Sequence, residues 1–203
     1  CFPAYARPEE IKDGHSEGCS QGHYVPNYPK VMRLGFGGIR ARAEARLATE
    51  TDPTKQDFLR AVSVTFEGAG ILARRYADLA DAMAPRAAPE RGAELTAIGK
   101  ACRRIATEPP QTFQDACQLT FFVHLLAVIE NHSLLSQGRM DQYLLPFYRT
   151  CDPVEAASLL RCLLVKLNDQ GDVWLGELAY DGEDNVVLGG LLVVPMGLLA
   201  AIT

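Results

Sequence analysis

The sequence predicts a mainly α-helical protein. Between residues 54 and 168, apolar side chains recur at the period of an α-helix. Asp-Pro pairs at 52–53 and 152–153 place a proline in the first turn of a helix, where its missing N–H is not needed. Only residues 186–188, just before two glycines, have the short apolar pattern of a β-strand.

The first two predicted helices are delimited by proline and glycine. One begins at Tyr28-Pro29 and runs to about Leu47, with a break where glycines stand at positions 35, 37 and 38. The next begins at Asp52-Pro53 and runs to Met83. Its expected buried face consists of the large apolar residues Phe58, Val62, Phe66, Ile71, Leu72, Tyr76, Leu79 and Met83.

Four further helices are expected. One covers about residues 89–106, with a face of Leu95, Ile98, Cys102 and Ile105, and ends before Pro109-Pro110. Thr112 is the N-cap of the next, at 113–129, which is apolar almost all round and is therefore expected to be the most buried helix. Shorter helices follow at 138–148 and 152–168.

These elements divide residues 1–203 into three parts of one domain. Residues 1–28 are rich in Gly and Pro and predict an irregular segment, 29–168 are helical, and 169–203 predict a loop, a short strand and an apolar tail. His15, Cys19 and His23 are spaced four apart, which would suit zinc on a helix. The glycines between them oppose a helix, so a loop without metal is favoured.

Composition excludes several classes of protein. The chain of 203 residues is 48% hydrophobic and 22% charged, has a net charge of −5 and contains no basic block, which excludes nucleic acid as the expected partner. Arg40, Arg42 and Arg46 are interrupted by acidic residues and predict a solvated helix face. The apolar run 191–202 is too short to span a bilayer, so no membrane is expected.

The cysteines point to a reducing compartment. Six are scattered along the chain without a Cys-x-x-Cys pair, which argues against a disulfide framework and favours the cytoplasm. Cys102, Cys117 and Cys162 fall within apolar helical patterns, where a free cysteine acts as a small hydrophobic residue.

A dense polar run, residues 130–148, follows the most apolar helix. It contains Asn, His, two Ser, Arg, Asp and two Gln between hydrophobic flanks. An unpaired buried polar group costs roughly 1–3 kcal/mol, so this run predicts either a polar network or a ligand site beside the core.

Several motifs, in the same order, resemble the glycyl radical enzymes related to pyruvate formate-lyase. They are Gly22-His23 with Pro26, Tyr28, Val31 and Gly35; Arg75-Tyr76-Ala77 with Leu79-Ala80; Glu94-Leu95, Cys102, Pro109-Pro110, Thr112-Phe113, Ala116 and Gln118; residues 138–148; and Asn185 with Leu188-Gly189-Gly190. The stretch Gly-Arg-Met-Asp-Gln-Tyr is the most specific and is more similar to the diol dehydratase and choline lyase branch.

The resemblance implies a ten-stranded α/β barrel wrapped by helices, of which this chain would be a helical part. It also implies a glycyl radical installed by an activase that carries an iron–sulfur cluster and S-adenosylmethionine. That radical oxidises a cysteine to a thiyl, which abstracts hydrogen from a small substrate. Cleavage of a C–O, C–N or C–C bond follows.

Two motifs of the family are missing from these 203 residues. None of the cysteines lies in a Gly-Cys-x-Glu setting, and the Arg-Val-x-Gly-Tyr wording around the glycyl radical is absent. After Gly190 the chain continues with apolar rather than acidic residues. We therefore expect a truncated or frame-shifted product without catalytic residues or a cofactor of its own.

Substrate-binding residues are assigned from the resemblance. His132 and Ser133 are the nearest match to a His-Ser pair that holds substrate hydroxyls, although a register shifted by one, Ser133 and Leu134, stays open. His23 matches a further substrate histidine. Their alternative roles are a helix cap and a turn residue.

The other polar residues are assigned structural roles. Arg139 and Asp141 are expected to form a structural pair, and His124 to be a core histidine with its hydrogen bonds satisfied. Glu130 has no identified partner that would make it a general base.

The functional hypothesis is therefore an inactive fragment of a glycyl radical dehydratase or lyase that acts on a small hydroxylated or amino substrate. The alternatives are a non-catalytic helical scaffold derived from this fold and an unrelated zinc-binding domain. The apolar tail, with one unpaired strand edge, predicts self-association through the C-terminal end.

Overall fold

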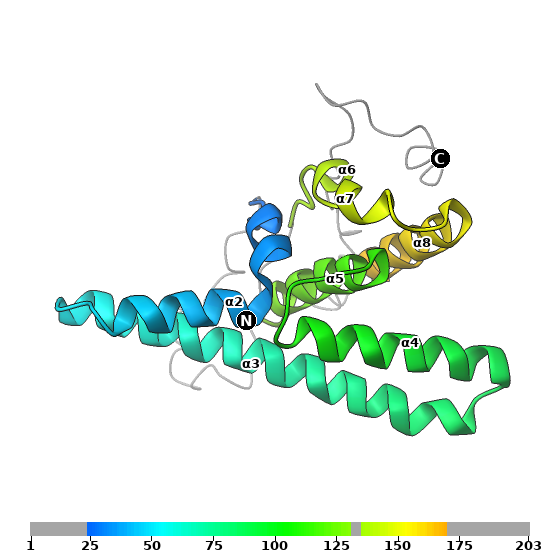
Figure 1. The fold of residues 1–203 in the computed structure, drawn as a ribbon, viewed down its shortest axis with the longest axis horizontal. Coiled ribbons are helices and arrows are strands. Elements are labelled where there is room, and N and C mark those ends of the chain that lie inside the picture. Colours follow the sequence, from blue (N-terminus) through cyan, green and yellow to red (C-terminus); the bar gives the residue numbers. More distant parts are fainter. Residues whose placement is uncertain (1–23, 131–134, 170–203) are drawn as a thin grey trace, which may run out of the picture.

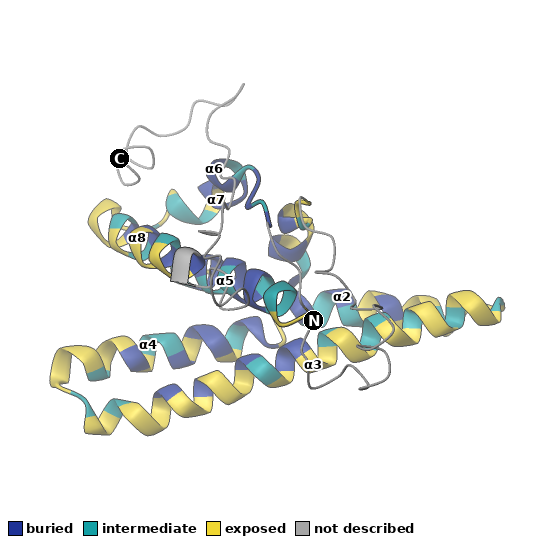
Figure 2. Cartoon of the chain, turned by 180° about the vertical axis from the view of Figure 1, so that it is seen from behind, coloured by how far each residue is buried: buried dark blue, intermediate teal, exposed yellow. Residues whose placement is uncertain are grey.

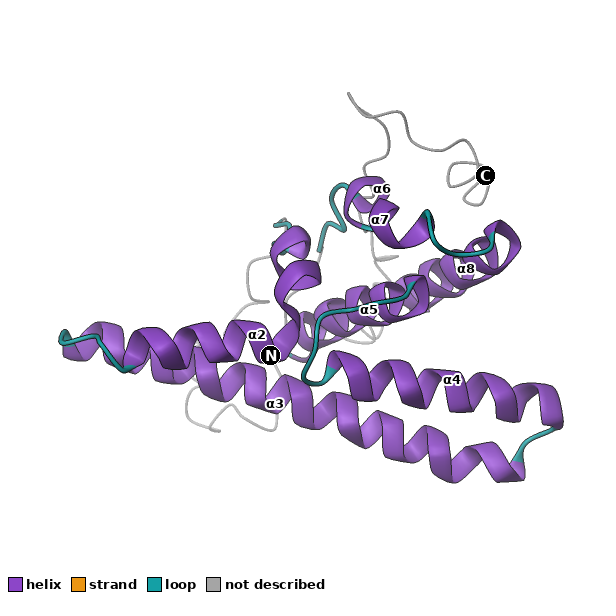
Figure 3. Cartoon of the chain, in the orientation of Figure 1, coloured by secondary structure: helices purple, strands orange, loops and turns teal. Residues whose placement is uncertain are grey.

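A computed structural model of the chain describes residues 24–130 and 135–169, and these residues form helices joined by short loops (Figure 3). The predicted strand at 186–188, the apolar tail and the irregular segment before residue 24 lie outside the described residues. The helices are α2 (Tyr28–Leu47), α3 (Pro53–Met83), the 3-10 turn η1 (Ala84–Arg86), α4 (Pro89–Ile105), α5 (Phe113–Ile129), α6 (Met140–Tyr143), α7 (Leu145–Tyr148) and α8 (Pro153–Asp169).

Two long helices, α3 and α4, form an antiparallel hairpin, and the second half of α2 continues along α3 (Figure 1). α5 packs on α4 and on α8. The two single-turn helices α6 and α7 follow the polar run and lie beside α2 and α5. None of the described helices has the length and apolar character needed to cross a membrane.

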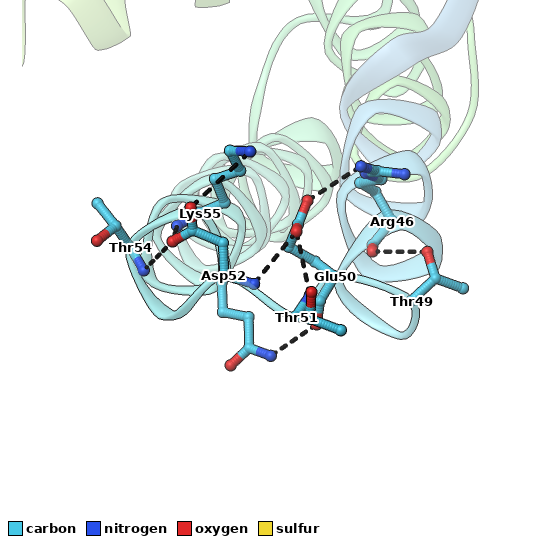
Figure 4. A network of polar contacts seen from close by, with 8 residues as sticks. Arg46, Thr49, Glu50, Thr51, Asp52, Thr54 and Lys55 are labelled. Carbon is cyan, nitrogen blue, oxygen red and sulfur yellow. Dashed lines mark hydrogen bonds and ion pairs between the residues drawn. The ribbon is translucent and has the colours of Figure 1, made fainter.

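The helix ends confirm the cap predictions. The Asp52 carboxylate accepts the backbone N–H of Thr54 at 2.9 Å and of Lys55 at 3.4 Å. Figure 4 shows how this turn is held: Glu50 accepts the N–H of Thr51 and forms an ion pair with Arg46. The predicted helix at 138–148 is instead two single turns, because Leu144 separates α6 from α7 and Pro146 lies in the first turn of α7.

A second cap, at the start of α5, is a capping box. The Thr112 hydroxyl accepts the N–H of Asp115, and the Asp115 carboxylate accepts the N–H of Thr112. Asp115 is buried and also binds Arg104 of α4 at 3.0 Å. This contact ties the start of α5 to the end of α4.

The predicted break in α2 is a kink at Gly35, which has φ 63° and ψ 177°. A Cβ at Gly35 would lie 2.5 Å from the carbonyl oxygen of Glu108, and one at Gly70 would lie 2.7 Å from that of Ala106. Gly37 approaches Thr107 in the same way. The turn that follows α4 therefore packs directly against the backbones of both α2 and α3, and only glycine permits that approach.

Among the long helices α5 is the most buried, as expected, since Ile129 is its only exposed residue (Figure 2). Its Leu119 and Phe122 join Phe36, Ile105 and Leu160 in one core. The predicted face of α4 is confirmed as well, with Leu95, Cys102 and Ile105 buried and Ile98 half-buried.

The predicted buried face of α3 is wrong in part. The fully buried positions of this helix are small: Ala69, Gly70, Ala73, Ala77 and Ala80. Val62, Phe66 and Leu72 are half-buried beside them, while Phe58, Ile71, Tyr76, Leu79 and Met83 are exposed. The reason is that α3 packs against both α2 and α4, and small residues let helix backbones come close.

Two surface predictions can also be compared with the structure. The cluster of Arg40, Arg42 and Arg46 is a solvated helix face, as predicted, with pairs from Arg40 to Glu44 at 2.8 Å and from Arg46 to Glu50 at 3.0 Å. The four described cysteines are free. Cys102 and Cys117 are buried as predicted, but Cys162 is exposed, so its assignment as a small core residue is wrong.

Candidate functional site

The polar run predicted beside the core forms a buried hydrogen-bonded cluster around Gln137. Its side chain is 0% exposed. The Tyr28 hydroxyl donates to Gln137 Oε1 at 2.7 Å, although the two residues are 109 positions apart in the sequence. On its other side, Gln137 Nε2 lies 3.1 Å from His124 Nδ1. One amide therefore connects α2, α5 and the loop before α6.

Donor chemistry fixes the roles in this contact. The Gln137 side chain donates only through Nε2, so His124 Nδ1 accepts and the ring proton is on Nε2. Burial lowers the pKa of His124 from its usual 6.5 to about 4, which keeps the imidazole neutral at pH 7. His124 is a core histidine, as predicted, and Gln137 is the hydrogen-bond partner of its Nδ1.

Tyr143 of α6 completes the cluster. Its ring stacks on that of Tyr28, with centroids 4.8 Å apart and planes at 15°, and its hydroxyl donates to the Gln137 carbonyl oxygen at 3.2 Å. Burial raises the pKa of Tyr143 well above its ordinary value. The cluster is thus uncharged at neutral pH, and its hydrogen bonds hold Gln137 in place.

An ion pair fixes the next part of the loop. Arg139 Nε and Nη2 donate to the two oxygens of Asp141 at 3.1 and 2.9 Å. The Asp141 side chain is buried, while that of Arg139 is one-third exposed. The prediction that these residues form a structural pair is confirmed, and the pair lies at the start of α6.

The predicted substrate residues His132, Ser133 and His23 lie outside the described residues, so their assignment stays a prediction. The same holds for the zinc alternative at His15, Cys19 and His23. Within residues 24–130 and 135–169 no group of His, Cys, Asp and Glu is arranged to hold a metal ion.

The described residues next to these candidates do meet. Tyr24 follows His23 in the sequence, and its carbonyl oxygen accepts the Ser136 N–H at 3.1 Å. Val25 packs against Gly138 so closely that a Cβ on the glycine would lie 2.7 Å from Val25 Cγ1. The fold therefore places the residues that follow His23 beside the residues that follow His132 and Ser133.

The aromatic members of the cluster were missed by the sequence analysis. Tyr28 and Tyr143 belong to motifs of the family, and nothing in their spacing shows that they share one glutamine. The signal available in the sequence was the unusual number of polar residues in the 130–148 run, of which Gln137 and Asp141 are buried.

A lowered pKa for His124 gives a testable pH dependence. The unfolded state binds a proton near pH 6.5 and the folded state only near pH 4, so stability is fully present above pH 6.5 and falls as the pH drops towards 4. Between pH 7 and pH 5 we expect a loss of about 2 kcal/mol in the free energy of unfolding. Urea unfolding at both pH values measures it. His124→Gln should abolish the difference, and an unchanged difference in that variant would assign it to other groups.

Comparison with known proteins places this fold in a defined class. The chain resembles the glycerol-bound form of the B12-independent glycerol dehydratase from Clostridium butyricum with a TM-score of 0.76 at 30% identity, covering 92% of this chain and 27% of that one. The described helices are therefore the helical part of a glycyl radical enzyme fold.

Sequence comparison gives the family. A family model described as Pyruvate formate lyase-like matches residues 4–191. The chain is 34% identical over 187 residues to the "Probable dehydratase YbiW" of Escherichia coli, covering 83% of this chain and 23% of the relative. It is 30% identical over 167 residues to the isethionate sulfite-lyase of Desulfovibrio desulfuricans, covering 75% of this chain and 20% of the relative.

The chain belongs to the pyruvate formate lyase-like family of glycyl radical enzymes, as its motifs predicted. It spans about a quarter or less of the length of the relatives it matches.

Proposed function

We propose that this chain is the helical, substrate-facing part of a glycyl radical dehydratase or lyase that cleaves a C–O, C–N or C–C bond of a small hydroxylated or amino substrate. His132, Ser133 and His23 would bind the polar groups of that substrate. The radical would supply the hydrogen abstraction, and the 203 residues contain neither of the two radical motifs. The chain alone is therefore expected to be inactive and to depend on an activase acting elsewhere in the parent enzyme.

The observation that carries this proposal is the contact between Tyr24 and Ser136. It lies between the two stretches that carry the candidate substrate residues. Beyond it, the buried amide of Gln137 is bound by Tyr28 and His124. A loop that is anchored at its edge by buried hydrogen bonds can hold substrate-binding side chains in a fixed geometry.

The first test is spectroscopic. When the purified chain is incubated anaerobically with a family activase, S-adenosylmethionine and a reductant, we expect no glycyl radical doublet by electron paramagnetic resonance. An intact relative activated in parallel is the control for activase competence. A doublet from this polypeptide would contradict the assignment of the radical groups to another stretch of the enzyme.

A non-catalytic helical scaffold is the second candidate, because the described residues form a well-packed helical core that carries no radical group. Reading the flanking DNA separates the two. Downstream codons that restore the Gly-Cys-x-Glu motif, or an adjacent activase gene, support a part of an enzyme. A downstream region that encodes no such motif, without an activase gene nearby, supports the scaffold.

A further inference from the structure

An open groove lies between α2, α3 and the C-terminal half of α5. Its volume is about 770 Å³. The walls are largely apolar, formed by side chains from all three helices. They include Val31, Leu34, Val62, Phe66, Val123 and Leu126. A groove of this size and character is suited to an apolar segment of chain rather than to a polar small molecule.

Two of the lining residues are large apolar side chains that project into solvent. Phe58 is 67% exposed and Val64 is 68% exposed. Both lie on α3, and Phe58 belongs to the face that the sequence predicted to be buried. The groove therefore has apolar surface left over after the described helices have packed.

Charged side chains also line the groove. Two cations, Lys30 and Arg42, line it together with one carboxylate, Glu130 at the end of α5. Among the described residues neither cation forms an ion pair, in contrast to Arg40 and Arg46 on the same helix. An occupant that carries carboxylates next to apolar residues would satisfy both features of this surface.

We propose that this groove is the docking site for the chain's own C-terminal segment, residues 170–203. That segment contains five carboxylates and no Lys or Arg, so its net charge equals that of the whole protein. Glu183 and Asp184 stand directly before the apolar stretches 186–188 and 191–202. Acidic and apolar residues thus stand next to one another in the tail, which suits an apolar groove lined by two cations and one carboxylate.

The connection is geometrically feasible. The described chain ends with α8, which packs on α5, and Val123 and Leu126 of α5 form one wall of the groove. A flexible chain of 34 residues has a mean end-to-end distance of about 30 Å. The tail is therefore long enough to extend along α5, on which α8 packs, towards the groove.

Docking also changes the expectation of self-association. The apolar tail remains an aggregation-prone segment when it is released, but within the groove it is covered by the same chain. Self-association through the tail is thus expected when the tail cannot bind in the groove. It should be suppressed when the tail is bound there.

The test compares exposed positions inside and outside the groove in the full chain. Phe58→Glu places a carboxylate in the groove at a position that is already solvent-exposed, so the fold should tolerate it. Val154→Glu is the matched control, because Val154 is 79% exposed on α8 and does not line the groove. Arg42→Glu, with Arg33→Glu as its control, tests the charge.

Hydrogen exchange followed by mass spectrometry gives the readout. In the native protein, amides within residues 186–202 should be protected, and Phe58→Glu and Arg42→Glu should each speed their exchange about tenfold or more, while both controls leave it unchanged. Size-exclusion chromatography should show larger species only for the two groove variants.

Three outcomes would overturn the proposal. One is a tail that is unprotected in the native protein. Another is a tail whose protection is the same in Phe58→Glu as in Val154→Glu. The third is protection that appears only at concentrations where the protein is dimeric, or that shifts to residues 1–23 instead, since either result gives the groove a different occupant. None of these readouts depends on the proposed enzymatic function.

Discussion

Replacing Gly35 by alanine is expected to lower the free energy of unfolding by about 3 kcal/mol or more. Gly35 has φ 63° and ψ 177°, a backbone conformation that residues with a Cβ scarcely adopt. The added methyl group would also lie 2.5 Å from the Glu108 carbonyl oxygen, which belongs to a backbone that is fixed by α4. Strain and steric clash act together, so the kink and the docking of α2 cannot both survive.

Gly68→Ala is the matched control for that substitution. Gly68 lies inside α3, and no atom lies within 4 Å of the position its Cβ would take. Its replacement should raise the free energy of unfolding by about 0.5–1 kcal/mol, because alanine has a higher helix propensity than glycine. Urea unfolding followed by far-ultraviolet circular dichroism measures both variants. Equal midpoints for Gly35→Ala and the native protein would show that α2 does not need glycine at its kink.

Replacing Gln137 by leucine is expected to cost about 2–4 kcal/mol of stability. Leucine has a similar volume, so the loss reports on hydrogen bonds rather than on a cavity. The change removes the bonds that the side chain makes with Tyr28 and His124 in a fully buried setting. Gln142→Leu is the control, since Gln142 is half-buried on the neighbouring helix α6, and it should change stability by less than about 0.5 kcal/mol.

A double-mutant cycle distinguishes the cluster from general disruption. Tyr28→Phe removes one hydroxyl and keeps the ring that stacks on Tyr143. If the Gln137 amide and this hydroxyl act as one unit, the double variant should lose clearly less stability than the sum of the single variants. Strict additivity would show that Gln137 contributes through contacts other than the bond to Tyr28.

The boundaries of the helices could be predicted from the sequence because they are set by local chemistry. Asp52 and Thr112 accept the first backbone N–H groups of α3 and α5, and each acts through residues two or three positions away. A glycine with positive φ breaks α2 at Gly35 for an equally local reason. Such signals are read within one helical turn.

The buried face of α3 could not be predicted from periodicity, because a periodic pattern identifies only the most hydrophobic face of a helix. Close packing against two helices selects a face by size instead, which is why Ala73 and Ala77 are buried and Leu79 is exposed. The cluster was predictable only in part. The polar run gave Gln137, but its partner Tyr28 lies 109 positions away and becomes its neighbour only through the fold.

The contact of Gly35, Gly37 and Gly70 with the turn after α4 has a consequence for how the protein unfolds. It joins backbone segments between 36 and 73 residues apart, and it exists only when α2, α3 and α4 are all in place. These three helices should therefore open as a single cooperative unit, with one opening free energy shared by their slowest amides. Fraying of the α3–α4 tip, far from that turn, would remain a separate and much cheaper event.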